Sequence, residues 1–197
     1  IKMSLLDHFS TELDELKQQG NFRQFTQNVQ HGRFIMIQNK TMLNLASNDY
    51  LGLAADINFR QEFLDSFPIE RSYFSSSSSR LLTGNFDEYE QLENSLSQAF
   101  GGRAALLFNS GYHMNIGILP AVANSKTLIL ADKLVHASMI DGIRLSGAQY
   151  VRYRHNDLQH LEQLLQKYHE DDKIERIIVV TESIFSMDGD ETDLAAL

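Results

Sequence analysis

Residues 127–181 read TLILADKLVHASMIDGIRLSGAQYVRYRHNDLQHLEQLLQKYHEDDKIERIIVVT, and this stretch decides the fold. In it, short runs of apolar and β-branched residues alternate with longer segments whose apolar residues recur at helical spacing. The expected strands and helices are, in order, Thr127–Ala131, His136–Leu145, Gln149–Tyr153, Asp157–Tyr168 and Arg176–Thr181. Such alternation predicts an α/β fold, with a mainly parallel sheet that is flanked by helices.

The alternation of expected strands and helices begins further upstream. Ala104–Phe108 is an expected strand, and Tyr112–Ala123 is an expected helix. Before them, helical patterns over Ile57–Phe67 and Asp87–Phe100 flank the serine run Ser75–Ser79. A loop is predicted for this run, because serine hydroxyls bond to the nearby backbone and compete with regular structure.

An N-terminal arm, residues 1–53, is expected before a large α/β domain that takes up residues 54–197. Apolar residues recur at spacings of three and four in Ile1–Gln19, and Gly20 follows as a stop signal. This pattern is typical of an amphipathic helix.

A hairpin is predicted in the rest of the arm. Arg33–Gln38 and Thr41–Ala46 are short runs rich in β-forming residues, and Asn39-Lys40 stands between them as the expected turn. A compact loop, Ser47–Leu53, is expected to follow the second strand.

Composition and charge exclude several classes of function. The chain has 26 acidic and 17 basic residues, with no cluster of Lys and Arg, which argues against nucleic-acid partners and against a basic membrane-binding face. It has no cysteine, so a disulfide framework or a thiolate site is not available. The apolar runs fall far short of the roughly 20 residues that a membrane span needs. We expect a soluble, cytoplasmic protein that acts on a small molecule.

Polar residues gather in the loops that follow the expected strands, where ligands of open α/β sheets bind. Gly111 and Tyr112 open a helix, whose free N–H groups suit a phosphate, although a glycine there is more often only a turn. His136 is placed to stack on a planar ligand or to act as an acid or base, although a lone histidine is more often a cap or a surface residue. Glu182 and Ser186 would reach into the same crevice as Gly111 and His136, or they would form no more than an acidic loop. No residues have metal-ligand spacing, and no metal is expected.

Five motifs, in this order, resemble the α-oxoamine synthases: NLASNDYLGL at 44–53, SRLLTGN at 79–85, SGY at 110–112, HAS at 136–138 and ESIFSMDGD at 182–190. The similarity extends from about Leu16 to the last residue. It implies the first part of an aminotransferase-like large domain of fold type I, in a homodimer with active sites at the subunit interface. It also implies pyridoxal 5'-phosphate (PLP) as cofactor, and decarboxylative condensation of an amino acid with an acyl-CoA.

The resemblance also implies roles for single residues around the cofactor. The backbone at Gly111 and Tyr112 would hold the PLP phosphate, and His136 would stack on the pyridine ring. Glu182 and Ser186 would line the pocket, and these two and His136 are the expected catalytic residues.

For the substrates, the resemblance implies that Asn48 contacts the amino-acid or thioester portion and that Arg23 binds the carboxylate end of the acyl-CoA. The Ser79–Asn85 motif looks closest to the alanine-using, biotin-pathway branch, so L-alanine and an acyl-CoA are the expected substrates. Glycine-using synthases and long-chain sphingoid-base synthases are the alternatives, together with a non-catalytic partner subunit. A generic nucleotide-binding module is a third reading. The sequence disfavours it, because the glycine-rich motifs G-x-G-x-x-G and G-x-x-x-x-G-K-[ST] are absent from it.

One family feature is absent from the sequence. The lysine that links the cofactor follows the last motif by several dozen residues in the family, whereas the nearest lysine here, Lys173, precedes that motif. We therefore expect that the 197-residue polypeptide is one part of a longer enzyme and has no synthase activity alone.

Overall fold

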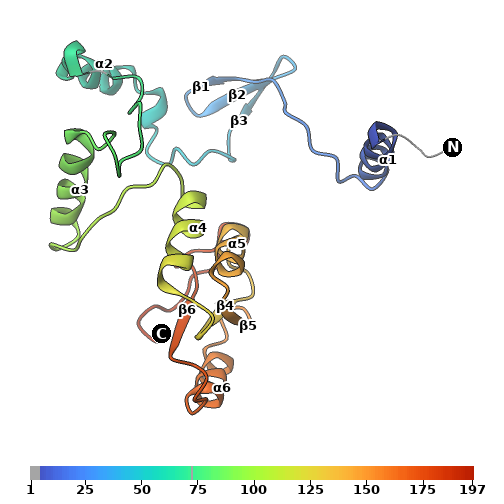
Figure 1. Ribbon diagram of the computed structural model, residues 1–197. Helices are drawn as coiled ribbons and strands as arrows, with labels where there is room; N and C mark the ends of the chain where they lie inside the picture. Colours follow the sequence, from blue (N-terminus) through green and yellow to red (C-terminus); the bar gives the residue numbers. More distant parts are fainter. Residues whose placement is uncertain (1–4, 72) are drawn as a thin grey trace. The chain divides into compact units, whose positions relative to one another are not determined.

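The computed structural model describes residues 5–71 and 73–197, which form two compact units, Ile1–Ser77 and Ser78–Leu197 (Figure 1). The expected helix at the N-terminus is present as α1 (Leu5–Gln18), and the first four residues of that expectation lie outside the described part. The boundary expected between residues 53 and 54 stays a prediction.

The first unit contains α1, a small antiparallel sheet and a second helix. After α1 its elements are β1 (Val29–His31), β2 (Phe34–Ile37), β3 (Lys40–Leu43), a 3-10 turn (Leu53–Ala55), α2 (Ile57–Ser66) and a second 3-10 turn (Ile69–Arg71). The side chain of Asp56 caps α2, because its carboxylate accepts hydrogen bonds from the N–H groups of Asn58 and Phe59.

The predicted hairpin is present, but its turn lies one residue earlier than expected. Ile37 pairs with Lys40, so Gln38 and Asn39 form the two-residue turn, with φ of 48° and 62°. Two-residue hairpin turns of this kind need positive φ at both positions, which sets the register. A third strand, β1, was not predicted, and it pairs with β2 across a turn at Gly32.

The second unit is the predicted α/β domain. Its elements are α3 (Asp87–Ala99), α4 (Gly111–Val122), β4 (Thr127–Asp132), α5 (Ala137–Ser146), β5 (Gln149–Tyr153), α6 (Leu158–Tyr168) and β6 (Arg176–Val180). The sheet has the order β5-β4-β6, and both pairs are parallel. The fold class and the strands expected within 127–181 are confirmed.

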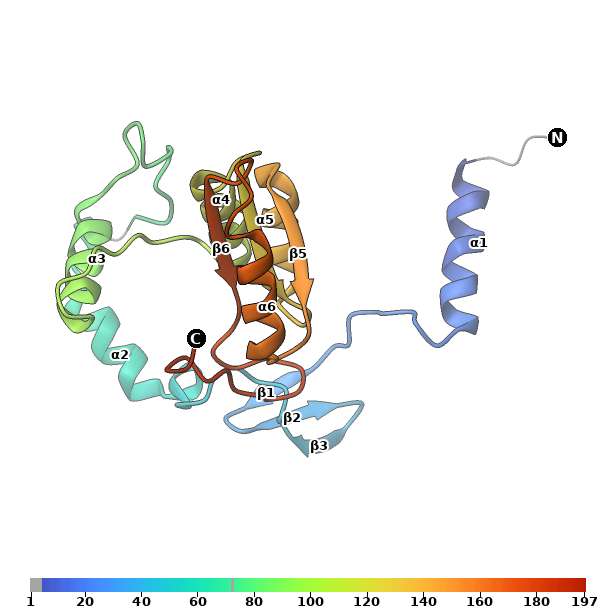
Figure 2. The same cartoon turned by 90° about the horizontal axis from the view of Figure 1, so that it is seen from below.

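Alternate residues of the central strand β4 build two cores, one on each face of the sheet. Ile129 and Ala131 pack with residues of α4 and α5, whereas Leu128 and Leu130 pack with residues of α6. Figure 2 shows the same division, with α6 on one side of the sheet and α4 and α5 on the other. Burial of each large apolar side chain contributes about 1.5–3 kcal/mol, so this strand anchors the unit.

The strand expected at Ala104–Phe108 does not form. The segment has no sheet partner among the described residues, and the N–H of Leu107 donates instead to Oε1 of Glu93 in α3, at 2.9 Å. A β-strand exists only through its ladder hydrogen bonds, so an apolar run without a neighbouring strand stays irregular.

The serine run Ser75–Ser79 forms neither helix nor strand, as predicted. Just after it, Arg80 makes a two-point ion pair with Glu93, with N···O distances of 2.7 and 2.9 Å. The guanidinium also lies over the ring of Tyr89, 4.4 Å from its centroid. One side chain therefore fastens this loop to α3. No helix in the described part of the chain is long and apolar enough to cross a membrane.

Candidate functional site

The N-terminal turns of α4 and α5 lie side by side in the second unit. Nδ2 of Asn115, in the second turn of α4, donates to Oγ of Ser138 in α5 at 2.9 Å. Further along, Gly142 of α5 lies against the backbone of Asn115 so closely that a side chain would not fit. Two helix N-termini, each with a partial positive charge, are therefore brought to one edge of the domain.

Gly111 and Tyr112 are the first two residues of α4, where the free N–H groups were expected. Ser110 is the N-cap, and its hydroxyl accepts from the N–H of His113 at 3.2 Å. Among the residues that the structure describes, none accepts a hydrogen bond from the N–H of Gly111 or Tyr112. A Cβ built on Gly111 would meet no atom within 4 Å, so the space on that side of Gly111 is open.

His136 is the N-cap of α5 instead of its first helical residue. Nδ1 accepts from the N–H of Ser138 at 3.2 Å and lies 2.7 Å from the Ser138 hydroxyl. Because that hydroxyl already accepts from Asn115, its own proton is directed to Nδ1, and the neutral ring carries its proton on Nε2. The chain Asn115–Ser138–His136 thus fixes both the tautomer and the orientation of an exposed imidazole.

Glu182, which follows β6, meets His136 as the strand-end argument predicted. Its Oε1 accepts from the backbone N–H of His136 at 2.5 Å. A carboxylate at the first turn of α5 is stabilised by the free N–H groups and by the helix dipole. Ser186 lies in an exposed turn four residues further, and no described contact joins it to His136 or Glu182.

The loop that carries Glu182 and Ser186 folds back on itself. The N–H of Phe185 donates to the carbonyl of Asp190, and the N–H of Gly189 donates to the carbonyl of Phe185, both at 2.8 Å. Gly189 has a φ of 75°, which side chains rarely tolerate, so the turn requires glycine there. Phe185 is only 2% exposed and belongs to the core shared with α4 and α5.

A buried ionic group beneath this loop was missed in the sequence. Asp132, at the end of β4, is 0% exposed and accepts from Nδ1 of His155 at 2.9 Å and from the N–H groups of Leu134 and Asn156. Nε2 of His155 lies 3.1 Å from Oδ2 of Asp190. The hydrogen bond to Asp132 raises the pKa of His155, and the bond to Asp190 adds to the effect.

The only sign of this group in the sequence was that all three residues fall in loops after strands. Asp132 and His155 are 23 positions apart, and His155 and Asp190 are 35 apart, so no short spacing pattern joins them.

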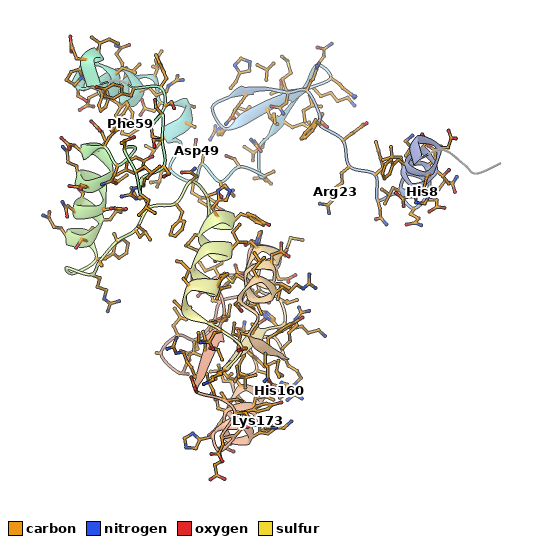
Figure 3. All side chains as sticks on the ribbon, in the orientation of Figure 1. His8, Arg23, Asp49, Phe59, His160 and Lys173 are labelled. Atoms are coloured by element: carbon orange, nitrogen blue, oxygen red, sulfur yellow. The ribbon has the colours of Figure 1, made fainter. Side chains whose placement is uncertain are left out.

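The two expected substrate residues, Asn48 and Arg23, lie in the first unit. Figure 3 labels Arg23, whose side chain projects from the extended segment between α1 and β1. Oδ1 of Asn48 is 3.4 Å from the hydroxyl of Tyr50. An open hollow of about 520 Å³ in the same unit is lined by Arg33 and Asp49, but Asn48 and Arg23 are not part of its wall. No described contact brings Asn48 and Arg23 together.

No group of three or more His, Cys, Asp or Glu side chains in the described ranges has an arrangement that could hold a metal ion.

Comparison with known proteins agrees with the fold and with the motifs. The sequence model of the family "Aminotransferase class I and II" matches residues 40–197. A Pasteurella multocida protein named as an 8-amino-7-oxononanoate synthase is 58% identical over 193 residues, which are 98% of this chain and 49% of that protein. A Haemophilus influenzae protein of the same name is 55% identical over 98% of this chain and 50% of that protein. The chain therefore spans about half the length of the curated relatives it matches.

Solved structures of the same group also match. A serine palmitoyltransferase from S. paucimobilis, determined with a bound PLP–myriocin aldimine, superimposes with a TM-score of 0.82 at 26% identity, over 98% of this chain and 49% of that chain. The 8-amino-7-oxononanoate synthase of Francisella tularensis gives a TM-score of 0.58 at 30% identity, over 76% of this chain and 39% of that chain. The chain belongs to the aminotransferase class I and II family, and within it to the α-oxoamine synthases.

Proposed function

We propose that the protein is a PLP-dependent acyltransferase that condenses L-alanine with pimeloyl-CoA, or another pimeloyl thioester, to 8-amino-7-oxononanoate, CoA and carbon dioxide in biotin biosynthesis. The observation that carries the proposal is the 58% identity to a relative of that name, which covers nearly the whole of this chain. The arrangement of α4, α5 and Glu182 supports it.

The start of α4 fits the phosphate group of PLP. The N–H groups of Gly111 and Tyr112 have no acceptor among the described residues, and the space beside Gly111 is open. A phosphate dianion at this position would gain two backbone hydrogen bonds and the favourable field of the helix. The neighbouring N-terminus of α5 adds a second field of the same sign.

The exposed face of His136 fits the pyridine ring. Because Asn115 and Ser138 fix the orientation of the imidazole, it needs no rearrangement to stack on a planar ligand. Glu182 anchors the backbone of His136, and Ser186 is the hydroxyl of the same loop that we assign to the pocket wall. When bound, PLP supplies an electron sink for the amino-acid substrate that loses its α-proton.

The remaining assignments follow the family resemblance. Asn48 would contact the amino-acid or thioester portion, and Arg23 would bind the carboxylate end of the acyl group. We propose a cytoplasmic homodimer, with active sites at the subunit interface. We also propose that the 197-residue polypeptide alone has no synthase activity, because none of its lysines follows the Glu182–Asp190 loop.

The high structural similarity to serine palmitoyltransferase favours a second candidate, a synthase that uses another amino acid and a longer acyl-CoA. Fold similarity alone does not choose between substrates, because one fold carries many of them. The identity values support our choice of the 8-amino-7-oxononanoate synthase branch, since they are 58% for the relative of that name and 26% for the palmitoyltransferase. A non-catalytic partner subunit is the other alternative.

The test uses the purified product of the complete reading frame. A visible absorbance band that appears with PLP and is lost on borohydride treatment supports a cofactor-binding enzyme. Product formation from pairs of L-alanine, glycine or L-serine with pimeloyl-, acetyl-, succinyl- or palmitoyl-CoA then identifies the branch. Preference for L-alanine with pimeloyl-CoA is the expected result. Preference for another pair contradicts the substrate assignment, and absence of the band contradicts the cofactor assignment.

Variants of His136 test the stacking role. His136→Ala and His136→Phe both remove the cap of α5, so any loss of folding stability is shared by the two. Only His136→Phe keeps a flat ring, and we expect it to bind PLP more tightly than His136→Ala does, by about two- to tenfold, since aromatic pairs contribute about 0.5–1.5 kcal/mol. Equal PLP affinities would exclude stacking at this position.

Variants of the loop test Ser186. Ser186→Ala is expected to weaken PLP binding, whereas Ser183→Ala, a change of the same kind at another exposed position of the loop, is expected to leave it unchanged. An equal effect of both changes would remove Ser186 from the pocket.

A further inference from the structure

Several contacts fasten the loop proposed to line the PLP pocket to the rest of the unit, and two of them flank the turn that carries Ser186. The first is the side chain of Phe185, which lies in the core next to Ser186 in the sequence. The second is Asp190, whose carboxylate reaches His155 in the loop after β5. Between these two points only residues 186–189 bulge outwards, and the Gly189-to-Phe185 hydrogen bond closes them into a turn.

His155 is the bridge between this loop and the sheet. Its side chain is 21% exposed, Nδ1 lies 2.9 Å from Oδ1 of the fully buried Asp132, and Nε2 lies 3.1 Å from Oδ2 of Asp190. Both carboxylates can only accept, so both ring nitrogens must donate for the two bonds to exist together. Only the imidazolium has two N–H donors, so the geometry selects the charged ring.

We propose that His155 is a positioning residue, which as an imidazolium between Asp132 and Asp190 fastens the loop that carries Glu182 and Ser186 to the ends of β4 and β5. This inference rests on the proposed function, because it is the assignment of Glu182 and Ser186 to a PLP pocket that gives the position of the loop a role. His155 itself touches neither substrate nor cofactor in the proposal.

The surroundings of His155 favour its charged form. Asp132 faces it from β4 and Asp190 faces it from the loop, and the ring of Phe185 packs edge-on against it, with centroids 4.5 Å apart. The nearest cation on its own segment, Arg154, is paired with Asp157 at 2.7 Å. The neighbouring His160 in α6 is engaged by the N–H of Arg154, at 3.0 Å. These contacts agree with the raised pKa of His155.

The pH dependence follows from the sign of this shift. A pKa raised above its ordinary value of 6.5 means that the bridge is complete below that pH and is lost as the pH rises through the value in the folded protein. The loop should therefore be held most firmly below pH 6.5, and it should loosen as the pH rises through the raised pKa of His155.

The experiment follows the loop in the cofactor-free protein, as the product of the complete reading frame, by hydrogen exchange. The reporters are the hydrogen-bonded amides of Phe185, Gly189 and Thr192, with protection corrected for the intrinsic pH dependence of exchange. His155→Gln breaks the bridge, and the exposed His169→Gln is its control. Asp190→Asn removes the outer carboxylate at a residue whose side chain is 53% exposed, so folding is not at risk, and Asp188→Asn makes the same change two residues away.

We expect His155→Gln and Asp190→Asn to lower protection of the three amides by about tenfold or more, as loss of one charge-assisted hydrogen bond implies, and the two controls to leave it unchanged. In the unmodified protein, protection should fall from about pH 6 to about pH 9, whereas in His155→Gln it should be low throughout. PLP affinity, measured separately, should fall in the two bridge variants and stay the same in the controls.

The outcomes separate this inference from the proposed function. Unchanged protection in both bridge variants, or protection of the unmodified loop that does not vary with pH, overturns the bridge. Lower protection with unchanged PLP affinity overturns the positioning role. Lower protection in a protein that binds no PLP in any form supports the bridge and overturns the proposed function instead.

Discussion

Gly142 lies so close to Asn115 that a methyl group on its Cα would be 2.4 Å from the Asn115 carbonyl oxygen. The contact joins α5 to α4 near their N-termini, where Gly111 and His136 lie. We expect Gly142→Ala to force the two helices apart and to lower the free energy of unfolding by about 1–3 kcal/mol, the usual cost of overpacking. Urea unfolding of the two proteins measures the difference.

Gly117→Ala in α4 is the matched control for this change. An added methyl group at that position meets only the Phe108 ring, at 3.3 Å, and this ring is partly exposed and can move. Its effect should be small, because alanine also gains helix propensity over glycine, by about 1 kcal/mol. Equal losses at the two positions would contradict the close contact at Gly142.

Ser138 is the middle of the chain that orients His136, and it is 2% exposed. Ser138→Ala leaves Nδ2 of Asn115 without its acceptor, so we expect a loss of about 1–3 kcal/mol in the free energy of unfolding. Nδ1 of His136 loses the hydroxyl but keeps the backbone N–H of residue 138 as a donor, so the ring should keep its proton on Nε2 while its nitrogen signals shift. Nitrogen chemical shifts of the labelled imidazole report the tautomer. Ser146→Ala, which removes another α5 hydroxyl, should leave the His136 signals in place.

The ion pair of Glu93 with Arg80 makes the stability of the second unit depend on pH in acid. Its hydrogen bonds to Arg80 and to the N–H of Leu107 lower the pKa of Glu93 from 4.5 to about 2. A lowered pKa in the folded state gives stability that is present above pH 4.5 and is lost as the pH falls towards 2. The urea midpoint of Glu93→Gln should therefore be below that of the unmodified protein near neutrality and should approach it in acid.

Glu90→Gln is the comparison for that measurement. Glu90 lies on the same helix and accepts from Nδ2 of Asn85, a bond that the amide oxygen of glutamine can still accept. The Glu90→Gln variant should lower the urea midpoint less than Glu93→Gln does, and its stability should still fall in acid as that of the unmodified protein does. A gap between Glu93→Gln and the unmodified protein that stays constant down to the lowest pH would show that Glu93 does not titrate in this range.

The titration of His155 should respond to single carboxylates. Because the bond to Asp190 raises the pKa of His155, Asp190→Asn should lower that pKa, whereas Asp188→Asn should leave it unchanged. Proton signals of the imidazole followed against pH measure both values. Equal pKa values in the two variants would show that Oδ2 of Asp190 is not a partner of Nε2 in solution.

The strands of the second unit were predictable because their signals are local. Gln149–Tyr153 was predicted with both of its ends correct, and Thr127–Ala131 and Arg176–Thr181 each differ from the structure by one residue. Apolar, β-branched runs bounded by polar loops leave little choice in a sheet that is covered on both faces. The meeting of Glu182 with His136 was predictable for a similar reason, since parallel strands bring their following loops to one edge.

The features that the sequence did not predict depend on distant partners. Ala104–Phe108 has the composition of a strand, but whether it becomes one depends on a neighbour, and the N–H of Leu107 bonds to Glu93 instead. The hairpin turn was misplaced by one residue because Asn39 suits a positive φ in either register. The His155 bridge joins the end of β4 to the loops after β5 and β6, and such long-range charge pairs leave no periodic pattern in the sequence.

The strand order β5-β4-β6 also has a consequence for synthesis on the ribosome. The middle strand of the sheet is made first, and both of its neighbours follow it in the chain. When Gln149–Tyr153 has emerged and paired, the other edge of β4 stays open until Arg176–Val180 arrives, which takes about one to five seconds at ~5–20 residues per second. During that interval the nascent chain presents an apolar strand edge of the kind that recruits other chains, so translation speed between Tyr153 and Arg176 sets how long the growing protein is exposed to aggregation.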